Sequence, residues 1–501
     1  MGVSATMTVE AYLSGSWVDI TADTLAAASP LRIAYGIDGS GPADVIAKVG
    51  TCGFTLRNDA GGSGGVVGYY SPRSSNVRTG WGFAVPVRVS FSSGAISGQV
   101  KHRGIVTVID PEPGLYGSKR VRVTSEDGMG RLLDAEVREL GIVQGEDEAQ
   151  LMDRVLDAVP TDAQPVARDL DPGTNTTDVA FDDLKGGTKA VAIIGELVRA
   201  AQGRAFIAGD GTFVYRNRHN IGALATSAVT LNDTMHGLSA PSSVDRLYNR
   251  VRVTTRRKTV SQTATDLLYD GVVQVGGDST LEVWTDYTDP SSGERKTKIG
   301  GVDVVTSLVA GTHYFAGPTE GGSESTASIT PTLEAFSTSA KWTLVNSSTT
   351  ALYVTLRVYG KAIRDLGPVV SEAVSVQPYG ERALNLELKY QASQDFGGSL
   401  AARLLSLYED LDNQIDSVSF VANDSATLME QALLREPGDI VTITESVTGV
   451  TAATAVIQGV ELTVTPPCWI RCTWRLAPAD ITGGAWELGT SALDSTTELA
   501  L

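Results

Sequence analysis

The stretch LLREPGDIVTIT, residues Leu433–Thr444, passes from helix-like to strand-like sequence within a few residues. Pro437 lacks a backbone N–H and cannot continue a helix, and Gly438 permits the left-handed turn that often follows one. The β-branched run Ile440–Thr444 then alternates its side chains between two faces, as a strand does. We therefore predict that this stretch is a corner of a β-structure.

Two carboxylates, Glu436 and Asp439, flank that corner. General acid–base catalysis needs an acid and a base that share a pocket with the substrate. The neighbouring sequence supplies no further group for such a pocket. We interpret the acidic turn as structural.

The composition narrows the possible functions. A chain of 501 residues is long enough for roughly three or four domains. Its 58 acidic and 40 basic residues give a formal net charge of −18. That balance argues against wrapping nucleic acid, which needs a basic surface. An acidic surface can still line a passage that DNA crosses without binding.

The first residues, MGVSATMTVEAYLSG, contain no basic and apolar signal peptide, and Gly2 is not followed by a convincing myristoylation sequence. No apolar window is long enough to span a membrane.

Cys468 and Cys472 lie four residues apart on a strand-like segment, roughly 13 Å when extended. A disulfide needs Cα atoms within about 7 Å, so we expect reduced, buried thiols and folding in a reducing cytoplasm.

The N-terminal quarter of the chain reads as short strands separated by turns. Alternating apolar and polar residues recur in segments 8–21, 52–59, 81–91, 104–111 and 119–127. Many short strands with turn signals between them are typical of an antiparallel barrel or sandwich.

The period changes in the middle of the chain. Segments 146–159 and 188–203 carry apolar stripes at helical spacing, and Gly203 is a plausible helix stop. Segment 204–218 then reads as two strands around Gly209-Asp210-Gly211, a hairpin. Residues 138–220 are therefore predicted to form a small α+β domain.

The C-terminal half returns to strands. A strand is predicted at 245–257, and another strongly β run at 351–363. Between them, residues 261–350 are rich in Thr, Ser and Gly and read as an inserted β-sandwich. A helix at 399–411 and further strands up to Leu476 follow.

Patterns that could carry catalysis or metal binding are weak. The histidines lack metal-binding spacing: His102, His219, His236 and His313. Ser63 lies in GGSGG (Gly61–Gly65), but a nucleophile elbow needs a strand before it and a helix after it. The carboxylates of 169–183 lack the spacing of a calcium loop. We predict no catalytic, cofactor-binding or metal-binding residues.

A basic stripe stands out in this acidic chain. Arg246, Arg250, Arg252 and Arg256 fall on one side of a strand, followed by Arg257 and Lys258. The stripe could bind an acidic partner or passing nucleic acid. The alternative, which we favour, is pairing with the chain's own surplus carboxylates.

Several segments, in their order along the chain, resemble the hub or tail-tip proteins of long-tailed bacteriophages, often called minor tail proteins. The matching segments are GSWVDIT (15–21), GTCGFTLRND (50–59), GRAFIAGDGTFVYRNRH (203–219), DRLYNRVRVT (245–254), QPYGERALNLELKYQ (377–391) and AWELGTSALDSTTELAL (485–501). The resemblance covers most of the chain except roughly 260–350.

This resemblance implies a mainly β protein that also contains the small α+β domain. It would have two barrel-like hub domains and the inserted β-sandwich. The expected domains are 8–135 for the first barrel, 138–220 for the α+β domain, 225–260 with 352–480 for the second barrel, 261–350 for the insertion and 481–501 for a C-terminal tail. Three copies would form a ring that imitates sixfold symmetry, related to contractile-tail baseplate hubs.

The implied role is structural. The ring would join the tail tube to the tip or fibres at the distal end of the virion and let DNA pass at infection. Implied partners are a distal tail protein ring, the tape measure protein and tail fibre or receptor-binding proteins, with assembly in the host cytoplasm. No membrane span, cofactor or active-site residue carries over from this family, so we expect no enzyme.

Two alternatives stay open. The insertion 261–350 could bind a host glycan during adsorption, with Trp284, Tyr287 and Trp342 stacking on sugar, although each fits a sandwich core better. A tail-associated wall hydrolase would need a Cys/His pair, a zinc cluster or two carboxylates about 5–10 Å apart. No segment is left over to hold such a site.

Overall fold

The computed structural model describes residues 2–25, 29–113, 119–137, 140–182, 184, 187–221, 226–233, 235–241, 243, 246–289, 291–292, 297–376, 380–409 and 415–479. The predicted C-terminal tail, 481–501, lies outside these residues. Strands make up 48% of the structure and helices 15%, so the fold is mainly β, as the sequence predicted.

The largest element is a 13-stranded sheet with two halves. The first half contains β1 (Thr6–Leu13), β2 (Ser16–Asp19), β3 (Leu31–Gly36), β4 (Lys48–Arg57), β5 (Pro86–Ser93), β6 (Ile96–Glu112) and β7 (Arg120–Glu126). The second contains β15 (Ser227–Leu231), β16 (Gly237–Ser239), β26 (Ser417–Val421), β27 (Ile440–Glu445), β28 (Val450–Thr465) and β29 (Trp469–Pro478). None of the described sheets closes, so the two predicted barrels are open halves of one sheet.

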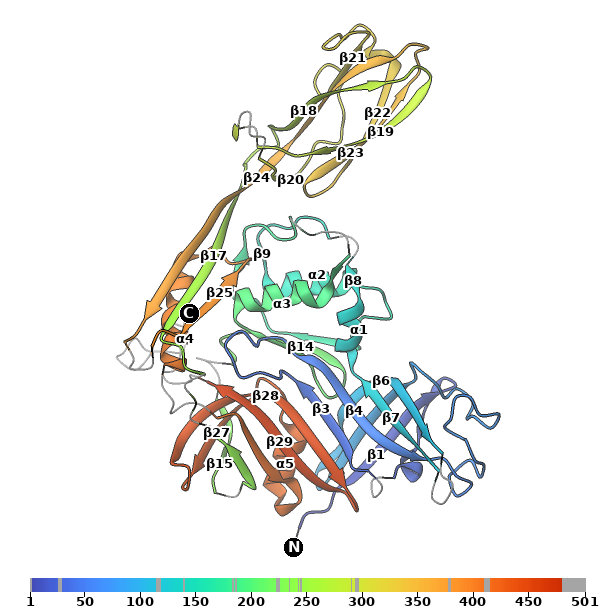
Figure 1. The fold of residues 1–501 in the computed structure, drawn as a ribbon, viewed down its shortest axis with the longest axis vertical. Helices are drawn as coiled ribbons and strands as arrows, with labels where there is room; N and C mark the ends of the chain where they lie inside the picture. The colour runs from blue at the N-terminus through green and yellow to red at the C-terminus, as the bar shows by residue number, and fades with distance from the viewer. Residues whose placement is uncertain are drawn as a thin grey trace.

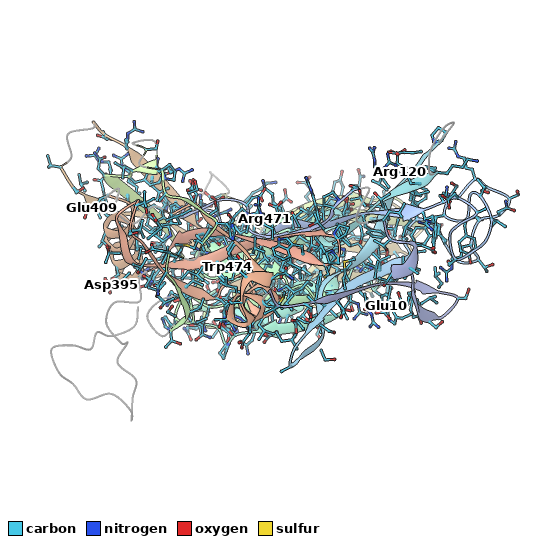
Figure 2. The ribbon with its side chains drawn as sticks, turned by 90° about the horizontal axis from the view of Figure 1, so that it is seen from below. Glu10, Arg120, Asp395, Glu409, Arg471 and Trp474 are labelled. Carbon is cyan, nitrogen blue, oxygen red and sulfur yellow. The ribbon has the colours of Figure 1, made fainter. Side chains whose placement is uncertain are left out.

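The two halves are joined through their backbones. Strand β28 runs antiparallel to β3, with Val460 opposite Tyr35 and Val464 opposite Leu31. One apolar core runs through both halves, and helix α5 (Ala426–Leu434) contributes to it. Figure 2 shows Trp474 of β29 near the middle of the molecule, between its two ends. The halves therefore fold as one body.

The α+β region contains α1 (Gly128–Asp134), α2 (Glu148–Ala158) and α3 (Ala190–Ala201), with a sheet of β10 (Ala167–Leu170), β14 (Thr212–Arg216) and β13 (Arg204–Ile207). Two short strand pairs complete it: β8 (Glu136–Val137) with β12 (Thr188–Lys189), and β9 (Glu146–Asp147) with β11 (Thr176–Thr177). Helix α3 ends one residue before the predicted stop, because Gln202 adopts the left-handed conformation at φ 57°. Gly203 is needed for a different reason: a Cβ there would lie 2.5 Å from the Tyr215 ring.

An arm projects from this body and carries the insertion (Figure 1). Its sheet contains β17 (Arg250–Val260), β25 (Ala383–Leu388) and part of β24 (Leu352–Val374), and α4 (Gln394–Tyr408) packs on it around Val251, Val253 and Leu386. The segments 250–260, 363–374 and 383–388, assigned above to the second barrel, therefore form a separate layer, while residues 352–362 of β24 pair with strands of the insertion. Their apolar residues face α4, which the strand pattern alone did not reveal.

The insertion has two sheets around one core. One contains β19 (Ser279–Asp286), β23 (Ser339–Asn346) and β22 (Ile329–Ala335). The other is built on β24, which pairs with β18 (Asp266–Val275), β20 (Gly300–Val302) and β21 (Tyr314–Gly317). Among the described residues, 3-10 turns include Thr21–Asp23, Thr326–Ser328 and Ala422–Asp424. Strand β24 thus runs from the insertion into the arm without a break.

A buried carboxylate at the start of α1 makes the stability of the fold depend on pH. Asp127 caps the helix by accepting from the Met129 N–H at 2.9 Å, and burial raises its pKa to about 7. The folded state therefore holds a proton that the unfolded chain releases near pH 4, so stability falls as pH rises between about 4 and 7.

Replacing Asp127 by Asn should remove this dependence, because Asn caps equally well and does not titrate. We expect the variant and the parent to be similar below about pH 4, where Asp127 is protonated in both the folded and the unfolded state. Above about pH 7 the variant should be more stable, the gap opening by up to about 1.4 kcal/mol per pH unit across the window. Urea unfolding across this pH range measures the difference in unfolding free energy between the two proteins. Parallel pH profiles would contradict the assignment of the pH dependence to Asp127.

Candidate functional site

The corner predicted at Pro437 is the point where three parts of the fold meet. Lys101 comes from β6 in the first half of the large sheet, and its side chain is fully buried. Its Nζ donates to the Glu436 Oε1 at 2.7 Å and to the Arg435 carbonyl at 3.0 Å. The ammonium also lies 5.5 Å from the centre of the Tyr35 ring. Burial and the neighbouring Glu436 charge raise the pKa of Tyr35 well above its usual range.

The backbone of the corner is fixed against β28. Gly438 has φ +96°, its N–H donates to the Ile457 carbonyl at 2.8 Å, and the Ile457 N–H donates to the Asp439 carbonyl at 2.8 Å. The Asp439 carboxylate accepts from the Glu436 N–H at 3.1 Å. Both carboxylates are thus engaged in holding the turn, in agreement with the structural interpretation.

The α+β region closes the third side of the corner. A Cβ at Gly438 would lie 3.3 Å from Arg216 Cγ, and one at Gly209 would lie 2.8 Å from the Lys101 Cα. The Gly-Asp-Gly hairpin therefore rests on the strand that carries Lys101. Sequence reasoning found the corner and the hairpin but missed Lys101, since its partner lies more than 300 residues away.

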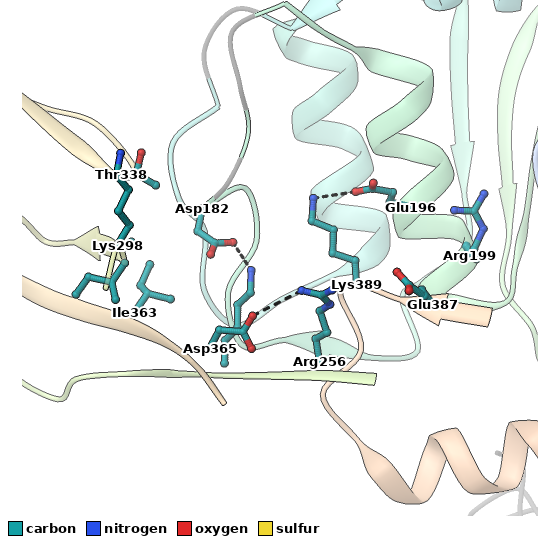
Figure 3. Close-up of a pocket in the computed structure, with 13 residues that line it drawn as sticks. Asp182, Glu196, Arg199, Arg256, Lys298, Thr338, Ile363, Asp365, Glu387 and Lys389 are labelled. Atoms are coloured by element: carbon teal, nitrogen blue, oxygen red, sulfur yellow. Dashed lines mark hydrogen bonds and ion pairs between the residues drawn. The ribbon is translucent and has the colours of Figure 1, made fainter. Parts of the chain in front are cut away.

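A charged cleft of about 580 Å³ separates the α+β region from the arm and the base of the insertion (Figure 3). Lys258 of β17 reaches Asp182 across it at 2.6 Å, and both side chains are about nine-tenths buried. Lys389 reaches Glu196 of α3 at 3.0 Å. These two cross-cleft ion pairs fix the arm to the body.

The basic stripe pairs with the chain's own carboxylates. Arg250 contacts Glu381 at 2.8 Å, and Arg252 contacts Glu372 at 2.7 Å. Arg256 faces Asp365 at 3.7 Å, and Arg246 pairs with Asp416. These contacts support the alternative favoured above, in which the stripe is structural.

Ser63 belongs to a loop-fixing network. Its hydroxyl donates to the Asp23 carboxylate, which also accepts from the Tyr70 hydroxyl at 2.6 Å. Burial alone would raise the pKa of Asp23, but these hydrogen bonds and the charge of Arg78 lower it. An ionised Asp23 that accepts from Ser63 with no imidazole between them anchors the glycine-rich loop and does not activate the hydroxyl as a nucleophile.

The histidines and the acidic segment have structural partners. His102 is buried beside the Ser125 hydroxyl at 2.8 Å, and burial lowers its pKa to about 3, so it is neutral. His236 lies 2.7 Å from Asp424, while Asp169 and Asp171 both pair with Arg216. Within the described ranges, no three His, Cys, Asp or Glu side chains form a group able to hold a metal ion.

The cysteines are free, buried thiols, as expected from their spacing: Cys52, Cys468 and Cys472.

The three aromatic residues considered for sugar binding separate into two kinds. Tyr287 and Trp342 are fully buried in the insertion core, so they cannot stack on a ligand, whereas Trp284 is 61% exposed.

Comparison with known proteins places this architecture. No protein-family model and no curated protein sequence matches the chain. Among solved structures, the 43 kDa tail protein of prophage MuSo2 from Shewanella oneidensis aligns with a TM-score of 0.50 at 9% identity, over 95% of this chain and 99% of that one. The chain has the fold of a prophage tail protein. The predicted resemblance to phage tail proteins is thus confirmed at the level of the fold.

Two further solved structures align with this tail-protein fold. The tail protein from Neisseria meningitidis MC58 gives a TM-score of 0.48 at 10% identity, over 94% of this chain and 96% of that one. The prophage tail protein gp18 from Listeria monocytogenes EGD-e gives 0.45 at 8% identity, over 94% of each chain. Within the part of the chain that the structure describes, no helix is long and apolar enough to cross a membrane.

Proposed function

We propose that this protein is a structural hub at the distal end of a phage tail. Three copies form a ring that joins the tail tube to the tip or fibres, and DNA passes through the ring at infection. The observation that carries the proposal is the large sheet: two halves share one core and are joined by the β3–β28 pairing. Three such molecules would present six sheet halves around an axis.

The partners follow from this role. One face of the ring meets a hexameric distal tail protein ring and the tape measure protein. The other face carries tail fibre or receptor-binding proteins, so the protein contributes to host attachment as part of the virion after assembly in the host cytoplasm. The net charge of −18 suits a lumen that repels DNA.

The role needs no catalysis. The grouped polar residues described above hold turns, loops and the arm in place, which supports a non-enzymatic protein. Large subunit interfaces, rather than a pocket, would supply its activity.

The hub role predicts a defined oligomer. Light scattering of the purified protein should give three times the mass of one chain, and negative-stain images should show threefold rings. The images should also show these rings binding a distal tail protein ring when the two are mixed. The proposal would be contradicted if the protein stayed monomeric at all concentrations and did not bind the distal tail protein ring.

A further inference from the structure

A second cleft, of about 690 Å³, opens where the base of the insertion faces the α+β region. It adjoins the charged cleft, because Thr338 lines both. The two clefts differ in chemistry. The charged cleft contains five basic side chains, whereas no Lys or Arg is among the described residues that line the second cleft.

The insertion side of the second cleft presents two exposed aromatic side chains. Trp284 of β19 is 61% exposed, and Phe336, which follows β22, is 39% exposed. Their ring centres lie 5.0 Å apart with the planes tilted by 38°. Adjacent exposed aromatic rings beside a cleft are typical of an interaction site, since they leave apolar surface in water until a partner covers it.

The opposite side is aliphatic. Leu140, Ile142, Leu184 and Ile193 line it from the α+β region, and Val302 and Val304 extend it along the base of the insertion. Branched aliphatic side chains provide no hydrogen bonds to hydroxyl groups, so a sugar placed here would lose solvation on that side without compensation. Leucine- or phenylalanine-like side chains bury favourably in the same space.

The described charged residues that line the cleft are both carboxylates. Asp303 and the exposed Glu334 line it, and Asp303 is paired with Lys361 at 2.6 Å. Asp303 already has a counter-charge, so a ligand that reaches Glu334 gains from a basic group close to its apolar part. Such a charge arrangement selects the partner more than it adds affinity.

We propose that this cleft binds a segment of a partner protein with apolar anchor residues and a neighbouring Lys or Arg. Trp284 and Phe336 cover one side of the anchors, the aliphatic residues cover the other, and Glu334 faces the basic group. The proposal rests on the hub role only for the source of the segment, a second tail protein. Binding itself can be measured whatever the oligomeric state.

A random-peptide library selected on the full-length protein tests this. The enriched peptides should contain paired apolar residues flanked by Lys or Arg. Trp284→Ala should weaken their binding at least tenfold, while Trp469→Ala, which removes a 44% exposed Trp on the large sheet, should leave it unchanged. Glu334→Lys should weaken the basic peptides about tenfold and favour their Glu-substituted versions.

Three results would overturn the proposal. One is an absence of enrichment, and another is enriched peptides that bind Trp284→Ala as tightly as the parent. The third is a chito- or cello-oligosaccharide that binds through Trp284 while peptides do not, which would identify a glycan site. Circular dichroism of each variant verifies folding, and the affected side chains are exposed. If the protein is monomeric but still binds the peptides, the hub role is contradicted and the peptide-binding proposal is supported.

Discussion

Replacing Glu436 by Ala is expected to lower the free energy of unfolding by about 3–5 kcal/mol, because it leaves the Lys101 ammonium buried without its counter-charge. Lys101 is fully buried, and the Arg435 carbonyl would be its remaining hydrogen-bond partner of the two described. The loss falls at the corner that joins the two sheet halves to the α+β region. Urea unfolding of the full-length chain measures the effect.

The reverse truncation should cost less. Lys101→Met keeps most of the side-chain volume and leaves Glu436, which is 26% exposed and can be hydrated, so we expect about 1–2 kcal/mol. The double variant should resemble Lys101→Met alone. As a control, Lys48→Ala removes an exposed pair with Asp38 and should change stability by less than about 1 kcal/mol. Equal costs for Glu436→Ala and Lys48→Ala would refute this account of the corner.

Replacing Gly36 by Ala is expected to break the joint between the two sheet halves. Gly36 has φ +98°, and a Cβ there would lie 2.5 Å from the Gln458 carbonyl oxygen and 2.8 Å from the Gly459 Cα. Both contacts are backbone atoms of β28, which cannot move without disturbing the β3–β28 ladder. We expect a loss of more than about 3 kcal/mol, the sum of an unfavourable φ and a backbone clash.

Gly15 provides the matched control. It has φ +90°, but a Cβ at this position would meet no atom within 4 Å, so Gly15→Ala isolates the conformational cost at about 1–2 kcal/mol. The difference between the two variants measures the clash at the joint. If both lose the same stability, the β3–β28 contact is not as tight as described. Threefold rings should also be lost in Gly36→Ala and kept in Gly15→Ala.

Local signals in the sequence were sufficient to predict the turns, strands and helices, but not which strands pair with one another. Pro437 and Gly438 specify a turn by their own backbone chemistry, and the Gly209-Asp210-Gly211 hairpin is equally local. The pairing of β3 with β28 joins residues more than 400 positions apart. An alternating apolar pattern does not specify which strand lies beside it, so two separate barrel-like domains were predicted where the two halves belong to one open sheet.

The same limit applied to the candidate sites. Trp284, Tyr287 and Trp342 look alike in sequence, yet only Trp284 of the three is exposed, because the two sheets of the insertion meet on the faces that carry the other two. Lys101 lies in a strand that contains many polar residues, and the sequence around it does not indicate that its side chain is completely buried. Its role depends on a corner contributed by the distant end of the chain.

Strand β24 has a mechanical consequence. A sideways load on the insertion travels along a single unbroken backbone into the layer covered by α4, so the insertion and the arm act as one lever. The register shifts between Arg256 and Lys258, opposite the stretch that contains Gly367 with φ +88°, and we expect this bulge to bend more readily than the regular ladder on either side of it. Lys258 pairs with Asp182 at that point, so the bulge coincides with one of the two ion pairs that attach the arm to the body.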